Sequence, residues 1–240
     1  MSLASRCAIL WWGVGAVLAT SAVVAVTGSP RGDREAMVRE ATVLLNSSPI
    51  HIAVIGDSYT SGYQDTGRGP ANWTALAWQN LAGRGMDVMA DVAAEGGAGY
   101  GVRGNHGSLF GDLTAHAVHP DDAVVVFFGS RNDQDVEPAQ LDGAFADTLG
   151  LARRIAPGAR ILVIGPPWPN ADVPGSVWRI RDLLNNEAAV VGARFVDPLA
   201  EQWFFGRPDL IGPDGVHPNN AGQVYLSEKI APLIAAELEQ

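Results

Sequence analysis

The sequence predicts an α/β fold, a three-layer sandwich in which helices cover both faces of a five-stranded parallel sheet. Short apolar runs rich in β-branched residues alternate with longer runs of helical periodicity along residues 49–240, which is the pattern of repeated strand–helix–strand units. The run 122–128 is wholly apolar after its first residue, as expected of a strand whose two faces are both covered. The polar residues singled out below follow the strands, and therefore lie on one edge of the sheet.

The elements are expected in a strictly alternating order. The strand at 50–55 is β-branched and ends at a glycine, and the helix at 138–155 places Leu141, Phe145 and Leu149 on one side. We expect strands at 50–55, 87–94, 122–128, 160–165 and 194–196, and helices at 73–81, 138–155, 177–191 and 221–238, with a shorter helix within 105–118.

Composition limits the classes of partner. The chain has 240 residues, 47% of them hydrophobic, which suffices for the core of one domain. Its formal net charge is −10, with 16 Lys and Arg against 26 Asp and Glu and no basic cluster. Nucleic acid and anionic membrane surfaces are therefore not expected as partners. Cys7 is the single cysteine, so no disulfide can form within the chain.

The N-terminal segment has the composition of a signal peptide or a signal anchor. No charged residue occurs between Cys7 and Pro30, a length that suits an apolar membrane-contacting helix. The positive-inside rule favours the orientation opposite to export, since Arg6 precedes the segment and further arginines follow it. We divide the chain into a signal segment at 1–30, a linker at 31–48 and a main domain at 49–240.

The first strand is followed by Gly56, Asp57 and Ser58, at the edge where parallel sheets bind ligands. In one interpretation Ser58 is a nucleophile and its neighbouring amide N–H groups bind an oxyanion. In another, Ser58, Thr60 and Ser61 hold a phosphate, as in the first loop of flavodoxin-like proteins. In a third interpretation, Asp57 or Ser58 only caps the following helix.

Asp214 and His217 favour the nucleophile. A nucleophilic serine needs a base within hydrogen-bond reach, and the base needs a partner that fixes its tautomer. The two residues are three positions apart in a Gly/Pro-rich turn before the last helix. Phosphate binding requires neither of them.

Four short motifs resemble those of the SGNH (GDSL-type) hydrolases. They occur in the family's order between residues 52 and 218, and read Gly56-Asp57-Ser58-Tyr59, Gly96-Gly97-Ala98-Gly99-Tyr100, Gly129-Ser130-Arg131-Asn132-Asp133 and Asp214-x-x-His217. The resemblance implies a flavodoxin-like sandwich and hydrolysis of esters through an acyl-enzyme. Ser58, Asp214 and His217 would be catalytic, and the oxyanion hole would comprise the amide of Ser58, the amide of Gly97 and the side chain of Asn132.

Two details of these motifs leave alternatives open. Gly99 is an alternative to Gly97 as the oxyanion donor, because the glycine-rich motif aligns in two ways. The family usually has glycine two residues before Asn132, where this chain has Ser130, and a Cβ is expected to crowd that loop. Asp57 is interpreted as a residue that holds its loop by hydrogen bonds, and Asp133 likewise.

Aromatic and histidine residues supply further candidates. Tyr100 and Trp168 are expected in the substrate pocket, with packing of its own loop as the alternative for Trp168. His116 and His119 share a helical spacing, but no third ligand follows at a suitable position. We expect neither a metal nor an organic cofactor.

The family covers short acyl esters, acetylated sugars, lysophospholipids and thioesters. No long apolar insertion is visible that would house a fatty chain, so short acyl groups on carbohydrate or cell-envelope substrates are expected. A lipase, lysophospholipase or thioesterase and a non-catalytic glycan-binding module are the alternatives. The resemblance also implies a monomeric catalytic domain outside the cytoplasm, secreted or anchored to the membrane.

Overall fold

The computed structural model describes residues 48–240. The predicted N-terminal hydrophobic helix, its cleavage or contact with a membrane, and nearly all of the linker at 31–48 lie outside the described residues. From residue 48 onward, no helix combines the length and the apolar character that a membrane crossing requires.

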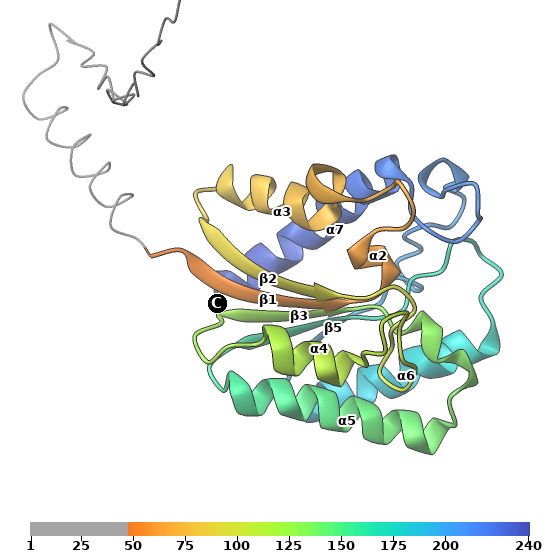
Figure 1. The fold of residues 1–240 in the computed structure, drawn as a ribbon, viewed down its shortest axis with the longest axis horizontal. Coiled ribbons are helices and arrows are strands. Elements are labelled where there is room, and N and C mark those ends of the chain that lie inside the picture. Colours follow the sequence, from red (N-terminus) through yellow and green to blue (C-terminus); the bar gives the residue numbers. More distant parts are fainter. Residues whose placement is uncertain (1–47) are drawn as a thin grey trace, which may run out of the picture. The chain divides into compact units, whose positions relative to one another are not determined.

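The sheet has five parallel strands in the order β2-β1-β3-β4-β5 (Figure 1). This confirms the predicted α/β fold. All five carboxyl ends meet at one edge, on the right in Figure 1, where the short helix α2 follows β1. The strands are β1 (Ile50–Gly56), β2 (Val88–Ala94), β3 (Val124–Phe128), β4 (Arg160–Ile164) and β5 (Arg194–Val196).

Helices cover both faces of the sheet. In Figure 1 α3 and α7 lie on one face, and α4, α5 and α6 on the other. The helices are α2 (Ser58–Ser61), α3 (Trp73–Ala82), α4 (Phe110–Ala117), α5 (Pro138–Ile155), α6 (Gly175–Val190) and α7 (Asn220–Leu238), with short 3₁₀ turns at Gly69–Ala71, Arg131–Asp135 and Pro208–Leu210.

Strand β3 separates two hydrophobic cores. Val124, Val126 and Phe128 pack toward α3 and α7, whereas Val125 and Phe127 pack toward α4, α5 and α6. Because successive side chains of a strand point to opposite faces, a strand covered on both sides must be apolar throughout. All five residues of β3 have no exposed surface.

The element boundaries differ from the predictions by a few residues. The third strand was expected from residue 122 but begins at Val124, because Asp122 belongs to the preceding turn, where its carboxylate accepts the His119 N–H at 2.7 Å. Helix α7 begins at Asn220, after Asn219, whose side chain accepts the Gly222 N–H at 3.0 Å as an N-cap.

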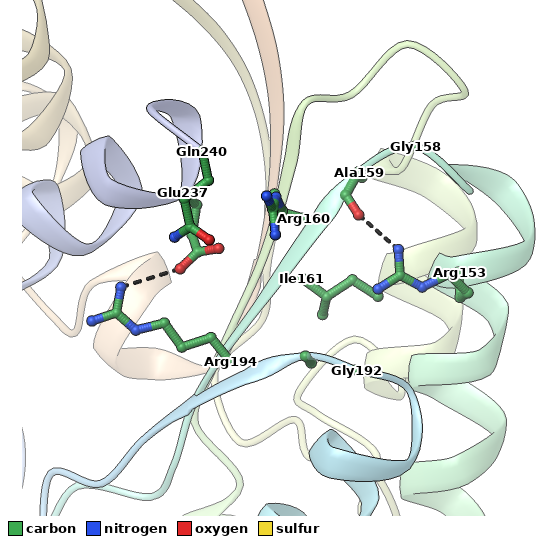
Figure 2. A pocket seen from close by; sticks show the side chains of 10 residues that line it. Arg153, Gly158, Ala159, Arg160, Ile161, Gly192, Arg194, Glu237 and Gln240 are labelled. Carbon is green, nitrogen blue, oxygen red and sulfur yellow. Dashed lines mark hydrogen bonds and ion pairs between the residues drawn. The ribbon is translucent and has the colours of Figure 1, made fainter.

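The opposite edge of the sheet carries a hollow of about 480 Å³, at the amino ends of β4 and β5 (Figure 2). Its cations are largely engaged within the fold: Arg194 pairs with Glu237 at 3.1 Å, and Arg153 donates to the Ala159 carbonyl at 2.7 Å. The loops that carry the sequence motifs lie at the other edge.

Candidate active site

Ser58 is the first residue of α2, directly after β1. The Asp57 carboxylate caps this helix by accepting the Tyr59 N–H at 2.9 Å. The Ser58 N–H belongs to the first turn, where an amide has no acceptor within its own helix, and none of the residues 48–240 accepts it. Ser58 is largely buried, with 7% of its surface exposed, and lines a hollow.

His217 lies between Ser58 and Asp214. Its Nε2 is 2.9 Å from Ser58 Oγ, and its Nδ1 is 2.6 Å from Asp214 Oδ2. The other Asp214 oxygen, Oδ1, accepts the N–H groups of Val216 and His217 at 3.0 Å each. The structure thus brings together the three residues that the sequence singled out, in the order serine, imidazole, carboxylate.

The electrostatics of Asp214 determine the tautomer of His217. Burial tends to raise the pKa of this carboxyl, but the hydrogen bonds from the His217 ring and from two backbone N–H groups outweigh it and lower the pKa to about 2. Asp214 is therefore ionised at neutral pH and accepts a hydrogen bond from Nδ1. The neutral ring then presents Nε2 as an acceptor to the Ser58 hydroxyl.

Two tyrosines hold the His217 loop, a role that sequence reasoning predicted for neither of them. The Tyr63 ring stacks on the His217 ring, with centroids 3.8 Å apart and planes 8° from parallel. The Tyr59 hydroxyl donates to the Val216 carbonyl at 2.6 Å. Tyr63 lies in a glycine-rich polar loop with no motif of its own, so no sequence signal pointed to it.

The glycine-rich loop after β2 distinguishes Gly97 from Gly99. Gly97 has φ +80°, lines the same hollow as Ser58 and His217, and its N–H has no acceptor among residues 48–240. The Gly99 N–H donates to the Val102 carbonyl at 2.9 Å, and a Cβ on Gly99 would overlap the Asp133 carboxylate. The Gly99 N–H therefore stabilises the loop and is not free to bind an oxyanion.

Asn132 reaches the same hollow from the loop after β3. Its Nδ2 donates to the Ala98 carbonyl at 2.8 Å and lies 3.4 Å from Asp57 Oδ2, a long contact. Ser130 is accommodated in its crowded position: it adopts φ +92°, and its buried hydroxyl donates to Asp133 Oδ2 at 3.0 Å.

Two buried carboxyl groups organise these loops, as their sequence positions suggested. Asp133 accepts the N–H groups of Tyr100, Gly101 and Val102 at 2.9–3.0 Å, which connects the loops after β2 and β3; burial raises its pKa despite these bonds. Asp57 has no exposed surface. Its burial, opposed by the Tyr59 N–H and the Arg131 charge, raises its pKa to about 7.

The two aromatic pocket candidates occupy other places. Tyr100 is only 2% exposed and packs on Phe110, Phe127 and Phe145 in the core, so the prediction of a pocket residue there was wrong. Trp168 is half-buried and does not line the hollow. Its ring lies 4.6 Å from the guanidinium carbon of Arg131, which does line it.

The hollow beside Ser58 measures about 250 Å³. Its residues come from four loops, which explains why no single stretch of sequence revealed it. It is lined by Ser58, Tyr63, Gly96, Gly97, Asn105, Arg131, Asn132, Val216 and His217. No group of three or more His, Cys, Asp or Glu side chains within residues 48–240 is arranged to hold a metal ion.

Comparison with known proteins identifies the family. The model of the GDSL-like lipase/acylhydrolase family matches residues 54–224. The chain belongs to this family. A GDSL lipase of Mycobacterium tuberculosis is 55% identical over 228 residues, which cover 94% of this chain and 96% of that protein. The predicted resemblance is confirmed, and the chain is a hydrolase of ester bonds.

Solved structures agree with the fold of this GDSL hydrolase. The crystal structure of TesA is 25% identical, with a TM-score of 0.62, and the match covers 78% of this chain and 99% of TesA. A carbohydrate esterase of family 3 from Talaromyces cellulolyticus is 16% identical, with a TM-score of 0.59, and the match covers 79% and 98% of the two chains. The latter similarity shows the common fold alone.

The raised pKa of Asp57 predicts a pH dependence of stability. Its pKa is about 7 in the folded chain against an ordinary value of 3.8. The folded state therefore holds the proton where the unfolded state has released it, so stability falls as pH rises from about 4 to 7, by up to about 4 kcal/mol. In Asp57→Asn, urea unfolding should show a smaller fall over this range than in the wild type.

The matched control is Asp65→Asn, because Asp65 is exposed. It should reproduce the wild-type pH dependence of the free energy of unfolding. Parallel curves for Asp57→Asn and the wild type would contradict the assignment, whatever the absolute stability of the variant.

Proposed function

We propose that this GDSL hydrolase is a serine esterase that works through an acyl-enzyme on Ser58. The proposal is carried by one observation, the 2.9 Å separation of Ser58 Oγ from His217 Nε2, with Asp214 at 2.6 Å from Nδ1. Nucleophile, base and orienting acid are already in contact in the chain as it stands.

In the first step Ser58 Oγ attacks the ester carbonyl carbon while His217 Nε2 takes the hydroxyl proton. The carbonyl π bond opens, and the negative charge moves to its oxygen. The bond to the alcohol then breaks, and His217 returns the proton to the leaving oxygen. Asp214, ionised because its pKa is about 2, stabilises the imidazolium between these events.

Three donors serve the oxyanion in this proposal: the N–H groups of Ser58 and Gly97, and the Asn132 amide. The two backbone N–H groups have no acceptor within the described chain. One Asn132 hydrogen is held by Ala98 at 2.8 Å, which orients the amide, and the other makes only the long contact with Asp57. We assign that second hydrogen to the oxyanion. Each such donor contributes about 3 kcal/mol to the barrier reduction.

In the second step water replaces the alcohol. His217 removes a proton from the water, whose oxygen attacks the acyl carbon, and the acid leaves as Ser58 regains its proton. Every proton transfer passes through His217, and the two steps need no other acid or base.

The size and lining of the hollow support short acyl groups. It measures about 250 Å³, and Val216 is the one aliphatic side chain among its described lining residues. The adjoining hollow of about 520 Å³, which also contacts Ser58, is lined mainly by polar residues and glycines. We therefore propose short acyl esters, such as acetyl groups, on carbohydrate or cell-envelope substrates. The similarity to a protein named GDSL lipase favours a second candidate, an esterase of longer acyl chains. A thioesterase would use the same site.

We also propose that the enzyme acts outside the cytoplasm as a monomer, with residues 1–30 serving as a signal peptide or membrane anchor. The support is the uncharged stretch between Cys7 and Pro30. A non-catalytic glycan-binding module would have no use for a serine, histidine and aspartate in mutual contact.

Substitution of Ser58, His217 or Asn132 should lower kcat/KM on 4-nitrophenyl acetate by different amounts. Ser58→Ala or His217→Ala should lower it by about 10⁴-fold or more, because each ends proton-coupled attack. Asn132→Ala should lower it about 10²- to 10³-fold, mainly through kcat. His116→Ala, at an exposed histidine, is the control and should behave as the wild type. Wild-type turnover by Ser58→Ala would refute the mechanism.

Acyl preference separates the two substrate candidates. With 4-nitrophenyl esters of two to sixteen carbons, a hollow of about 250 Å³ predicts the highest kcat/KM at two to four carbons and a steady decline thereafter. An optimum at the longest chains would favour the lipase candidate and overturn our choice.

A further inference from the structure

Among residues 48–240, Arg131 is the one arginine or lysine that lines the hollow of about 250 Å³ beside Ser58, whereas Arg68 lines an adjoining hollow that also contacts Ser58. It precedes Asn132 in the loop after β3 and is half-buried. The motif at residues 129–133 placed Arg131 next to the oxyanion candidate Asn132, but no role was predicted for its charge. Neither the proposed oxyanion donors nor the proton transfers require it.

The guanidinium has no carboxylate partner within the described residues. Of the residues 48–240, none places a carboxylate oxygen within 4.0 Å of it, although five arginine–carboxylate ion pairs occur in the same part of the chain. Its one side-chain hydrogen bond goes from Nη1 to the Tyr59 hydroxyl at 3.3 Å. An arginine carries five N–H donors, so most of them remain for another molecule.

The nearby acids leave that charge largely uncompensated. Burial raises the pKa of Asp57 to about 7, although the charge of Arg131 lowers it. At neutral pH this carboxyl is therefore only partly ionised. The carboxylate oxygens of Asp133 accept hydrogen bonds from three backbone N–H groups and from the Ser130 hydroxyl. Asp214 is paired with His217.

Two aromatic rings hold the guanidinium in place. Its central carbon lies 4.6 Å from the Trp168 ring centroid and 5.8 Å from that of Tyr59. Cation–π contacts of this kind restrain the guanidinium and lower the entropy lost when it binds a ligand. Planar, orientated guanidinium groups are suited to bidentate recognition of carboxylate and phosphate.

We propose that Arg131 binds a negatively charged oxygen group of the substrate, a carboxylate or a phosphate close to the scissile ester. The preferred substrates of this enzyme are thus esters that carry an anionic group. Trp168 is a positioning residue for Arg131. This inference rests on the proposed esterase activity and adds the charge of the substrate to it.

The test compares esters that differ in one ionised group. On the alcohol side the substrates are 3-acetoxybenzoate, 3-acetoxyphenyl phosphate and the neutral 3-acetoxybenzamide. On the acyl side they are mono-4-nitrophenyl glutarate and the neutral 4-nitrophenyl pentanoate. In at least one set the wild type should favour an anionic ester by about tenfold or more in kcat/KM, as expected of a charge-assisted hydrogen bond. The set that responds identifies the group and the side of the ester that carries it.

Arg131→Met removes the charge and should bring that ratio close to one, and Arg131→Lys should restore part of it. The ratio is the readout, so a general loss of activity in a variant cancels. Arg84→Met removes the same charge at an exposed position that does not line the hollow and should keep the wild-type ratio. The wild-type preference should also weaken with added salt, because charge attraction is screened.

The outcomes separate this inference from the function on which it rests. Hydrolysis of the neutral esters without any preference for an anionic one would overturn the role of Arg131 and leave the esterase intact. A preference that survives in Arg131→Met would also overturn it. Failure of the wild type to hydrolyse any of the esters would instead count against the proposed esterase.

Discussion

The catalytic arrangement depends on a contact between residues 159 positions apart, the imidazole of His217 and the hydroxyl of Ser58. Ser58 follows β1, the strand between β2 and the central strand β3, whereas His217 lies just before the last helix, α7. The contact therefore exists only if α7 sits correctly on the sheet. Burial of its apolar side chains against α3 and the strands supplies the free energy that holds it there.

Several hydrogen bonds then fix the position of the loop after β1 relative to the start of α7. The Tyr59 hydroxyl binds the Val216 carbonyl, and Gln223 of α7 accepts the Trp73 N–H at 2.9 Å. Asn220 accepts the Gly67 N–H at 3.2 Å. Because these bonds join the loop after β1 to the start of α7, a small displacement of the helix would separate the base from the nucleophile. Tyr63, stacked on the imidazole, belongs to the same loop.

Much of this could be predicted from the sequence, for physical reasons that differ between residues. The strands were visible because both faces of the sheet are buried, which forces continuous apolar runs such as β3. Asp214 and His217 were predictable because they lie within a single turn, where the spacing in the sequence sets their geometry. Ser58 was predictable because it directly follows the first strand. The Asp57 cap was visible for the same reason.

Contacts between loops were not predictable in this way. Tyr63 and Arg131 reach the hollow through the path of their loops, which no periodicity encodes. Sequence alone favoured Gly97 but left Gly99 as an alternative. The structure distinguishes them because the Gly99 N–H donates to the Val102 carbonyl and Asp133 packs against Gly99. Tyr100 follows the glycine motif, yet its ring turns into the core among Phe110, Phe127 and Phe145.

The central claim is that Ser58 is the nucleophile, and covalent capture tests it most directly. A fluorophosphonate transfers its phosphonyl group to an activated serine oxygen, with loss of fluoride, and mass spectrometry of the digested protein locates the adduct. We predict one adduct per chain, on the peptide that contains Ser58, and none in His217→Ala. Folded, active enzyme that carries no adduct at Ser58, or carries it on another serine, would contradict the account.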